Sequence, residues 1–165
     1  MPVSDIKAHV GGLDWDLPSP FLTLITVSPD DIDGLGHANN AAYVVWCELC
    51  AWRHSENLGL SVKDYQRLDR GVAIHQADYT YLQPCFSGDS LAIGTWLVKC
   101  DGRLRLERNF QIINQNSGET LLRGRWQLVS VILSSGKPTR LPPEFVKAYT
   151  AAVIEVPFRT SNLNE

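Results

Sequence analysis

The sequence predicts an α+β domain in which a five-stranded antiparallel sheet wraps around one long central helix. The length of 165 residues suits a single domain, since domains commonly hold about 100–150 residues. Strand-like segments follow one another through short turns instead of alternating with helices, which favours an antiparallel sheet. One helical segment is apolar on almost every side, so other elements are expected to surround it.

Five segments have the composition of β-strands, and turn-forming residues separate most of them. Polar and apolar side chains alternate most regularly in the segment 103–113. Its inward-facing set is Leu104, Leu106, Phe110 and Ile112. Its outward-facing set is Arg103, Arg105, Glu107, Asn109 and Gln111. The predicted strands are 21–28, 72–82, 90–100, 103–113 and 120–133.

The predicted central helix begins with residues 41–52, AAYVVWCELCAW, which are apolar at every position except Glu48. Asn39 or Asn40 is a natural N-cap, because an Asn side chain accepts a hydrogen bond from a free amide of the first turn. The helix is expected to run for about four turns and to end near Gly59. Two shorter helices are predicted over 61–69 and 143–153.

The sequence divides into one domain and two flanking segments. Residues 1–20 lack sustained periodicity and are interpreted as an N-terminal extension. Residues 21–155 hold all the predicted elements and form the domain, and residues 156–165 form a C-terminal tail.

The charge balance argues against two classes of partner. Fifteen Lys and Arg residues against eighteen Asp and Glu give a net charge of −3, too weak a field to indicate nucleic acid or an anionic membrane. No apolar run suits a signal peptide or a membrane span, so the chain is expected to be cytoplasmic with reduced cysteines. Cys47 and Cys50 are interpreted as small buried hydrophobes, and no ligand spacing indicates a metal.

The densest polar cluster lies between the first strand and the central helix. Its members are Asp30, Asp31, Asp33, His37, Asn39 and Asn40. A helix N-terminus offers free amide donors that can polarise a carbonyl or hold an oxyanion, and a carboxylate beside it can act as nucleophile or base. The pattern therefore indicates acyl transfer to water, although Asp, Asn and Gly are also the residues that loops and N-caps prefer.

The stretch from Val27 to Glu48, VSPDDIDGLGHANNAAYVVWCE, resembles the hallmark of the hotdog-fold acyl-CoA thioesterases of the 4-hydroxybenzoyl-CoA thioesterase-like group. That hallmark is D-x-D-x-x-G-H-x-N-N-x-x-Y-x-x-x-x-E, and each fixed position is matched. Residues 78–91, DYTYLQPCFSGDSL, are similar to the family's passage from one strand to the next through a Pro and a G-D turn. The resemblance covers about residues 21–135 and implies the hotdog fold.

The resemblance implies roles for four residues of the loop. Asp33 takes the place of the catalytic carboxylate, as nucleophile or general base, and the backbone amide of Asn40 polarises the thioester carbonyl. His37 and Asn39 orient the acyl group. The implied reaction is hydrolysis of an acyl-CoA or acyl-carrier-protein thioester to a carboxylic acid and a free thiol, with no cofactor.

Four further candidates for substrate contact have two interpretations each. Tyr43 either lines the acyl pocket or packs in the core. Glu48, on a helix expected to be buried, is either a second base or, as we favour, a support that accepts hydrogen bonds from the loop, such as one from His37. Arg103 and Arg105 form either a solvated face or a clamp on the phosphates of coenzyme A.

An open sheet edge indicates self-association, which the resembled family achieves by pairing two sheets with the active sites at the interface. We therefore expect a homodimer or a homotetramer. Two alternative functions are a non-catalytic acyl-CoA-binding protein and a hotdog enoyl-CoA hydratase, whose motif the loop does not resemble. The acyl group is not indicated by the sequence.

Overall fold

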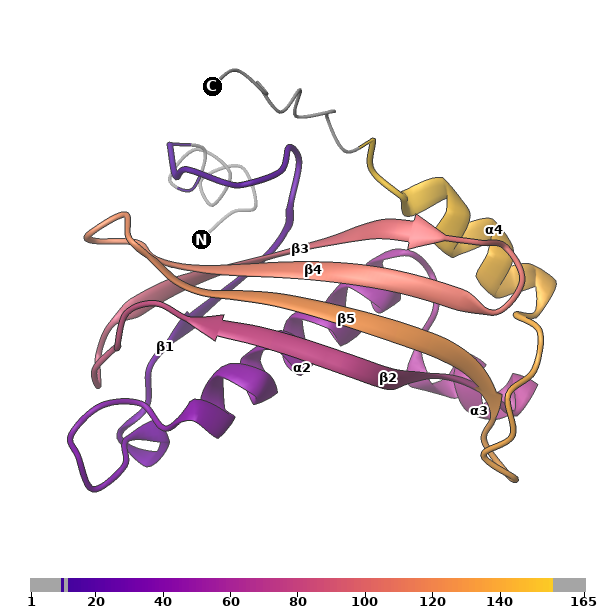
Figure 1. Ribbon diagram of the computed structural model, residues 1–165, viewed down its shortest axis with the longest axis horizontal. Helices are drawn as coiled ribbons and strands as arrows, with labels where there is room; N and C mark the ends of the chain where they lie inside the picture. Colours follow the sequence, from indigo (N-terminus) through magenta and orange to yellow (C-terminus); the bar gives the residue numbers. More distant parts are fainter. Residues whose placement is uncertain (1–9, 11, 156–165) are drawn as a thin grey trace, which may run out of the picture.

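The computed structural model describes residue 10 and residues 12–155, so residues 1–9, residue 11 and the predicted tail at 156–165 lie outside the described part of the chain (Figure 1). Five antiparallel strands form one sheet in the spatial order β1-β3-β4-β5-β2. The strands are β1 (Phe21–Thr26), β2 (Arg70–Tyr81), β3 (Ser90–Cys100), β4 (Arg105–Asn114) and β5 (Thr120–Ile132). The predicted five-stranded antiparallel sheet is confirmed, with its ends shifted by a few residues.

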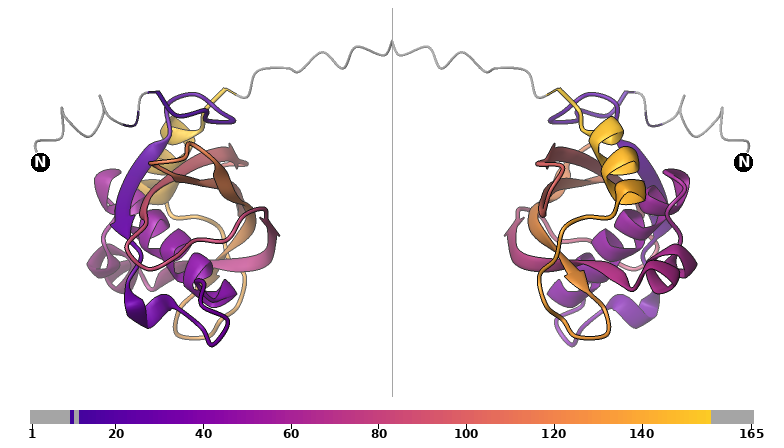
Figure 2. Two further views of the ribbon diagram at one scale, coloured as in Figure 1. Left: turned by 90° about the vertical axis from the view of Figure 1, so that its left-hand side faces the viewer. Right: turned by 90° about the vertical axis from the view of Figure 1, so that its right-hand side faces the viewer.

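The sheet curves around the helix α2 (Asn40–Asn57), as the end views of Figure 2 show. Apolar side chains of α2 and of the concave face of the sheet form the main core, which includes Tyr43, Trp46, Ile93, Phe110 and Trp126. The concave face is apolar along β4 because side chains alternate between the two faces of a strand, as predicted. Leu106, Phe110 and Ile112 lie on this face, where each is at most 2% exposed.

The enclosure of α2 is less complete than its apolar composition predicts. Val45 is 62% exposed, Leu49 and Trp52 are each 37% exposed, and all three lie on the side of α2 that the sheet leaves open. Five strands of one chain cover only part of the circumference of the helix. The expectation of a helix surrounded on almost every side is therefore wrong for the single chain.

Residues 12–20 cover part of the convex face of the sheet, over β3 and β4. Trp15 packs edge-on against Trp96 at 5.9 Å between ring centroids, and the indole Nε1 of Trp96 donates to the Pro18 carbonyl over 2.8 Å. Gln111, predicted to face outward, does lie on this face but is fully buried, because the covering segment contacts it. Its amide donates to the Asp14 carbonyl over 3.0 Å, so burial here is decided by a segment remote in sequence.

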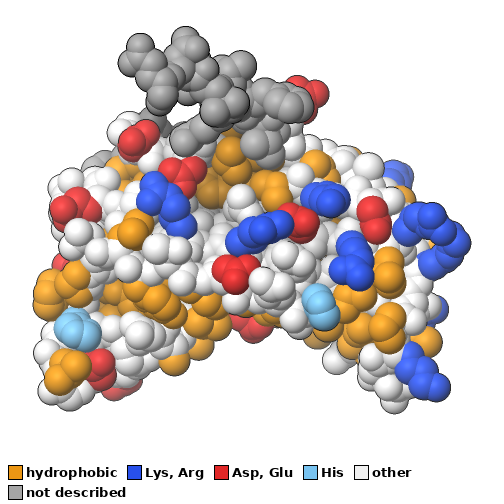
Figure 3. Space-filling view, viewed as in Figure 1, with side chains coloured by type: hydrophobic (Ala, Val, Ile, Leu, Met, Phe, Trp, Pro, Cys, Tyr) orange, Lys and Arg blue, Asp and Glu red, His pale blue; other side chains and the backbone are white. Residues whose placement is uncertain are grey.

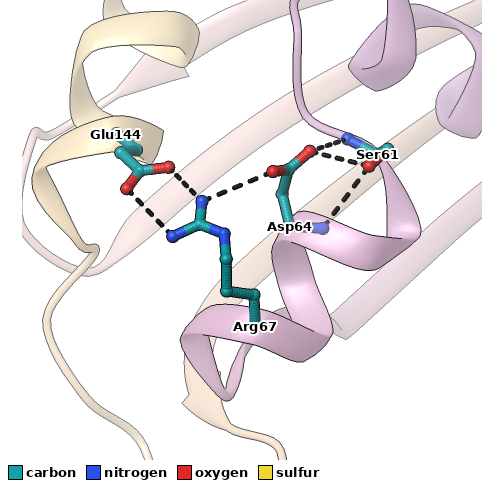
Figure 4. A network of polar contacts seen from close by, with 4 residues as sticks. All are labelled: Ser61, Asp64, Arg67 and Glu144. Atoms are coloured by element: carbon teal, nitrogen blue, oxygen red, sulfur yellow. Dashed lines mark hydrogen bonds and ion pairs between the residues drawn. The ribbon is translucent and has the colours of Figure 1, made fainter.

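Two short helices, α3 (Val62–Leu68) and α4 (Pro143–Ala152), close one end of the sheet around a second apolar cluster that includes Tyr65, Phe145 and Tyr149. Arg67 of α3 donates to Glu144 of α4 over 2.7 Å and to Asp64 over 3.4 Å (Figure 4). Because these charges are exposed, the pairing orients the two helices more than it stabilises the fold.

The cysteines of α2 behave as the sequence predicts. Cys47 and Cys50 are fully buried and unpaired, and burial raises the pKa of the Cys50 thiol to about 11. Burial therefore keeps this thiol protonated at neutral pH, as expected of a small buried hydrophobe. Among the described helices, none combines the length and the apolar character that crossing a membrane requires.

Candidate functional site

The polar cluster of the sequence lies in the loop between β1 and α2, and the backbone of this loop is closely tied. A 3-10 turn, η1 (Pro29–Asp31), is capped by Ser28, whose Oγ accepts the Asp30 amide over 3.2 Å. The Asp33 amide donates to the His37 carbonyl over 3.0 Å, which closes a tight turn. Gly36 occupies this turn at φ 86°, a conformation that L-residues rarely adopt. The turn holds Asp33 in a fixed position at the surface.

Asp33 has one engaged and one available carboxylate oxygen. Oδ1 accepts the Leu35 amide over 2.8 Å, whereas Oδ2 lies 3.9 Å from His37 Nδ1, too far for a hydrogen bond. The two side chains are 33% and 39% exposed, respectively. An oriented carboxylate with a solvent-accessible oxygen can act on water or on a bound carbonyl.

The helix N-terminus behind this loop presents free amides. Asn39 is the N-cap, since its Oδ1 accepts the Ala42 amide over 2.9 Å, and its Nδ2 donates to the Asp31 carbonyl over 3.2 Å. The amides of Asn40 and Ala41 have no acceptor within the described part of the chain. These amides carry the positive end of the helix dipole, as the predicted role of the Asn40 amide requires. The Asn39 side chain is occupied in the cap.

Tyr43 belongs to the core below this helix end. It is 2% exposed, and its hydroxyl lies 3.2 Å from Cys85 Sγ in a hydrogen bond. Burial, together with this bond, raises the pKa of the Tyr43 hydroxyl well above its ordinary value. Tyr81 packs edge-on against Tyr43 and donates to the Asn40 carbonyl over 3.1 Å. The end of β2 thereby holds the first turn of α2 in place.

The structure brings four predicted site residues together, namely Asp33, His37, Asn39 and Asn40. Glu48 lies two turns further along α2, where it is exposed and makes no hydrogen bond within residues 10 and 12–155. The expectation that Glu48 is buried and bonded to the loop or to His37 is therefore wrong. The reason is that Glu48 lies on the side of α2 that the sheet does not cover.

Arg103 and Arg105 lie at the opposite end of the sheet from Asp33. Both are exposed and belong to the connection from β3 to β4 and the start of β4, close to α4 (Figure 1). The loop of Asp33 instead adjoins the start of β3, where the Val27 amide donates to the Asp89 carbonyl over 2.9 Å. Within one chain these arginines and the loop do not form one site.

A cavity along the second half of α2 contains polar residues that the sequence predictions did not include. Arg108 of β4 is only 4% exposed and contacts His54 of α2, which is 8% exposed. The alternation of β4 contained the signal, because Arg108 falls in phase with the inward-facing Leu106 and Phe110. A cation at an inward position is uncommon, and it needs a partner or a function.

Hydrophobic side chains gather along the margin formed by β2 and the open side of α2. Figure 3 shows them along the lower, hollowed border of the molecule. The large exposed apolar residues of this margin include Val45, Leu49, Trp52, Ile74, Tyr81 and Leu82.

The architecture, a sheet curved around one helix with a polar loop at the helix N-terminus, is the hotdog fold. Three solved structures show the same fold. The 1,4-dihydroxy-2-naphthoyl-CoA thioesterase Slr0204 from Synechocystis matches with a TM-score of 0.72 and 20% identity, over 80% of this chain and 96% of that one. The DHNA-CoA thioesterase from Staphylococcus aureus matches with a TM-score of 0.73 and 23% identity, over 79% of this chain and 88% of that one.

The third is the protein SAV2348 from Staphylococcus aureus in complex with CoA, with a TM-score of 0.75 and 17% identity over 92% of this chain and 97% of that one. Comparison with curated proteins gives no match. The model of the thioesterase-like superfamily matches residues 27–149, which include the whole polar loop and all of α2. The chain belongs to the thioesterase-like superfamily.

Proposed function

We propose that the protein hydrolyses acyl-CoA thioesters to a carboxylic acid and free coenzyme A. The observation that carries the proposal is the pairing of Asp33, which keeps one carboxylate oxygen available, with the unbonded amides of Asn40 and Ala41 at the start of α2. The three solved structures support it through their fold, since two are described as CoA thioesterases and the third holds CoA.

The reaction follows from the charges of this loop. The thioester oxygen accepts hydrogen bonds from the helix amides, which stabilise the negative charge that develops on it. Asp33 either removes a proton from a water that attacks the carbonyl carbon or attacks that carbon itself. In the first route the carbon–sulfur bond breaks, the sulfur takes up the proton that left the water, and the water oxygen becomes part of the acid. In the second route the carbon–sulfur bond breaks to leave a mixed anhydride between the acyl group and Asp33; water then hydrolyses this anhydride, which releases the acid, restores the Asp33 carboxylate and supplies the proton that the thiolate takes up.

Substitution of one carboxylate tests this proposal. In Asp33→Asn we expect thiol release from a panel of acyl-CoA substrates to fall at least 100-fold, because the variant loses the nucleophile or base. Asp30→Asn is the matched control, since Asp30 is an exposed carboxylate of the same loop whose side chain makes no bond in the described residues. Near-normal turnover in Asp33→Asn would contradict the assignment, and binding of acyl-CoA without thiol release by the wild type would favour a non-catalytic binding protein.

We also propose that the active form is a homodimer. Among the strands that the structure describes, β2 pairs only with β5; its residues 73–78 are exposed, and the apolar side chains of α2 and β2 lie beside this edge. Two-fold pairing of β2 edges would extend the sheet and cover Val45 and Leu49.

The mass in solution tests the homodimer. Leu49→Lys should reduce the mass measured by light scattering, whereas Val62→Lys, at an exposed apolar residue of α3, should leave it unchanged. A wild-type monomer at micromolar concentration would contradict the proposal.

Contact of Arg103 and Arg105 with coenzyme A bound at Asp33 requires this dimer, because the arginines and Asp33 lie at opposite ends of one sheet. Antiparallel pairing of two β2 strands turns the end of one sheet that carries the arginines toward the Asp33 end of the other. Replacing both arginines by Ala should then raise KM for acyl-CoA with little change in kcat, because they would bind the phosphates and not the reacting carbonyl. An unchanged KM would leave them as a solvated surface.

A further inference from the structure

A cavity of about 110 Å³ lies between the second half of α2, the strands β2, β3, β4 and β5, and the helices α3 and α4. Its walls are largely apolar, with Trp52, Val72, Ile74, Leu97, Leu106, Trp126 and Leu128. Its polar lining residues are Glu48, Ser55, Tyr65, Arg108 and Tyr149. Glu48 and Ser55 lie 8 and 15 residues beyond Asn40, so the cavity is roughly 12–22 Å along the helix from the amides proposed to hold the thioester. It is a separate region of the molecule.

Arg108 is a buried cation without an anionic partner. Both of its hydrogen bonds run from Nη1, to His54 Nδ1 over 2.9 Å and to Thr95 Oγ1 over 3.2 Å. Within residues 10 and 12–155, no carboxylate lies within ion-pair distance of the guanidinium, and Nε and Nη2 make no hydrogen bond. Arginine keeps its charge in proteins, so desolvation of this group is strongly unfavourable unless an anion balances it.

The surroundings of Arg108 add no second positive charge. An arginine can only donate, so His54 Nδ1 is the acceptor and the imidazole is neutral. Burial, followed by the charge of Arg108, lowers the pKa of His54 to about 4, so the ring stays neutral at physiological pH. The ring also stacks on Phe21 at 4.8 Å between centroids, which fixes its orientation. The cavity therefore contains one positive charge, the Arg108 guanidinium, whose position is fixed by the hydrogen bond to His54.

A chain of hydroxyl groups lines the same cavity. The Tyr149 hydroxyl lies 3.0 Å from Ser55 Oγ and is also hydrogen-bonded to the Tyr65 hydroxyl. These hydroxyls can turn a donor toward an anion beside Arg108. Burial raises the pKa of Tyr65 well above its ordinary value, so Tyr65 is not itself the missing anion.

Glu48 is the carboxylate that the cavity wall does contain, and it lies at the exposed side of α2 without an ion pair. If Glu48 were the counter-ion of Arg108, its removal would weaken the fold. If an external anion binds Arg108, Glu48 is a like charge near the entrance, and its removal would strengthen binding. The two possibilities predict opposite results for one substitution.

We propose that this cavity binds the carboxylate group of a partly apolar organic acid. The carboxylate pairs with the Arg108 guanidinium, whose Nε and Nη2 donors match two carboxylate oxygens, while the aromatic and aliphatic walls contact the remainder of the ligand. The carboxylate belongs either to a compact free acid or to the far end of a long acyl chain of a CoA thioester, because the cavity begins about 12 Å along α2 from the amides proposed to hold the thioester. Only the second source rests on the function proposed above.

Benzoate and its neutral counterpart benzamide are the first probes, with affinities measured by titration calorimetry on the full-length protein. We expect benzoate to bind at least tenfold more tightly than benzamide, and Arg108→Met to abolish the difference. Glu48→Gln should fold normally and tighten benzoate binding several-fold. The wild-type comparison stands by itself even if Arg108→Met does not fold.

A second binding experiment distinguishes the two sources of the carboxylate. It uses the Asp33→Asn variant, in which hydrolysis of the thioester does not interfere with the measurement. If the carboxylate belongs to an acyl group, a CoA thioester whose chain is long enough to reach the cavity from the helix amides, hexadecanedioyl-CoA, binds at least tenfold more tightly than palmitoyl-CoA, and Arg108→Met removes that preference. If it belongs to a free acid, the substitution affects benzoate alone. The proposal is overturned if neither experiment shows a preference for the carboxylate, if the preference survives Arg108→Met, or if Glu48→Gln destabilises the protein without tightening benzoate.

Discussion

The adjacent residues Asn39 and Asn40 provide the sharpest test of how the candidate site is built. The sequence motif treats them alike, but the structure gives them different tasks. The Asn39 side chain makes two hydrogen bonds: its Oδ1 caps α2, and its Nδ2 donates to η1. The exposed Asn40 side chain makes no hydrogen bond in the described residues, so Asn40 contributes its backbone amide. Truncation to Ala should therefore destabilise the protein at Asn39 and leave its stability nearly unchanged at Asn40.

The expected decrease in the free energy of unfolding of Asn39→Ala follows from the two hydrogen bonds that the variant loses. Loss of an N-cap side chain costs about 1 kcal/mol, and loss of the second hydrogen bond, to the Asp31 carbonyl, costs about 1 kcal/mol more. We expect the free energy of unfolding to fall by about 2 kcal/mol in Asn39→Ala and to change by less than about 0.5 kcal/mol in Asn40→Ala. The thioesterase activity of Asn39→Ala should also fall, because the amides of the first turn lose their fixed position.

Urea denaturation followed by tryptophan fluorescence measures the stabilities, and thiol release measures the activity. Asn39→Ser should recover part of the lost stability, because Ser restores the cap but not the bond to the Asp31 carbonyl. Equal stabilities of the two Ala variants would refute the reasoning. A large loss of activity in Asn40→Ala with an intact fold would show that the Asn40 side chain, and not only its amide, takes part in the reaction.

Two further predictions concern the packing around the sheet. The lowered pKa of His54, from 6.5 to about 4, means that between these values the unfolded chain binds a proton that the folded chain does not. The free energy of unfolding should therefore decrease as the pH falls from 6.5 to 4, by about 2–3 kcal/mol from this residue. His54→Gln, which keeps an acceptor for Arg108 but does not titrate, should flatten the curve measured by urea denaturation at several pH values, and an unchanged slope would contradict the assignment. Gly94→Ala should destabilise the protein by about 1–3 kcal/mol, because a Cβ there would lie 2.5 Å from the Trp15 ring. Gly34→Ala, where a Cβ meets nothing within 4 Å, is the control, and equal melting temperatures for the two variants would show that Trp15 does not pack on β3 as described.

The local parts of the site could be predicted from the sequence because short-range chemistry determines them. An N-cap at Asn39 or Asn40 and the placement of Asp33 in the loop before α2 follow from Asx chemistry and from the polar segment between a strand and an apolar helix, and the structure shows that Asn39 is the cap. The buried state of Cys47 and Cys50 follows from the same apolar run. Each of these features depends on residues only a few positions apart.

The side of α2 that stays uncovered could not be predicted in this way. The apolar composition of α2 indicates a helix that is buried on nearly all sides. A single sheet of five strands packs against only part of its surface. The exposure of Glu48, and the error about its role, have the same cause. Gln111 illustrates the reverse case, since an outward-facing polar residue becomes buried when the Asp14 region folds over it.

The sequence by itself determined the order and type of the elements, because hydrophobic periodicity and turn chemistry are local properties of the chain. It also determined which loop carries the carboxylate and the helix cap. The tertiary structure decided which charges meet: it separated Arg103 and Arg105 from the Asp33 loop and joined Arg108 of β4 to His54 of α2 across 54 positions. Such pairings depend on sheet register and on the curvature of the sheet around α2, and both are set by contacts between residues far apart in the chain.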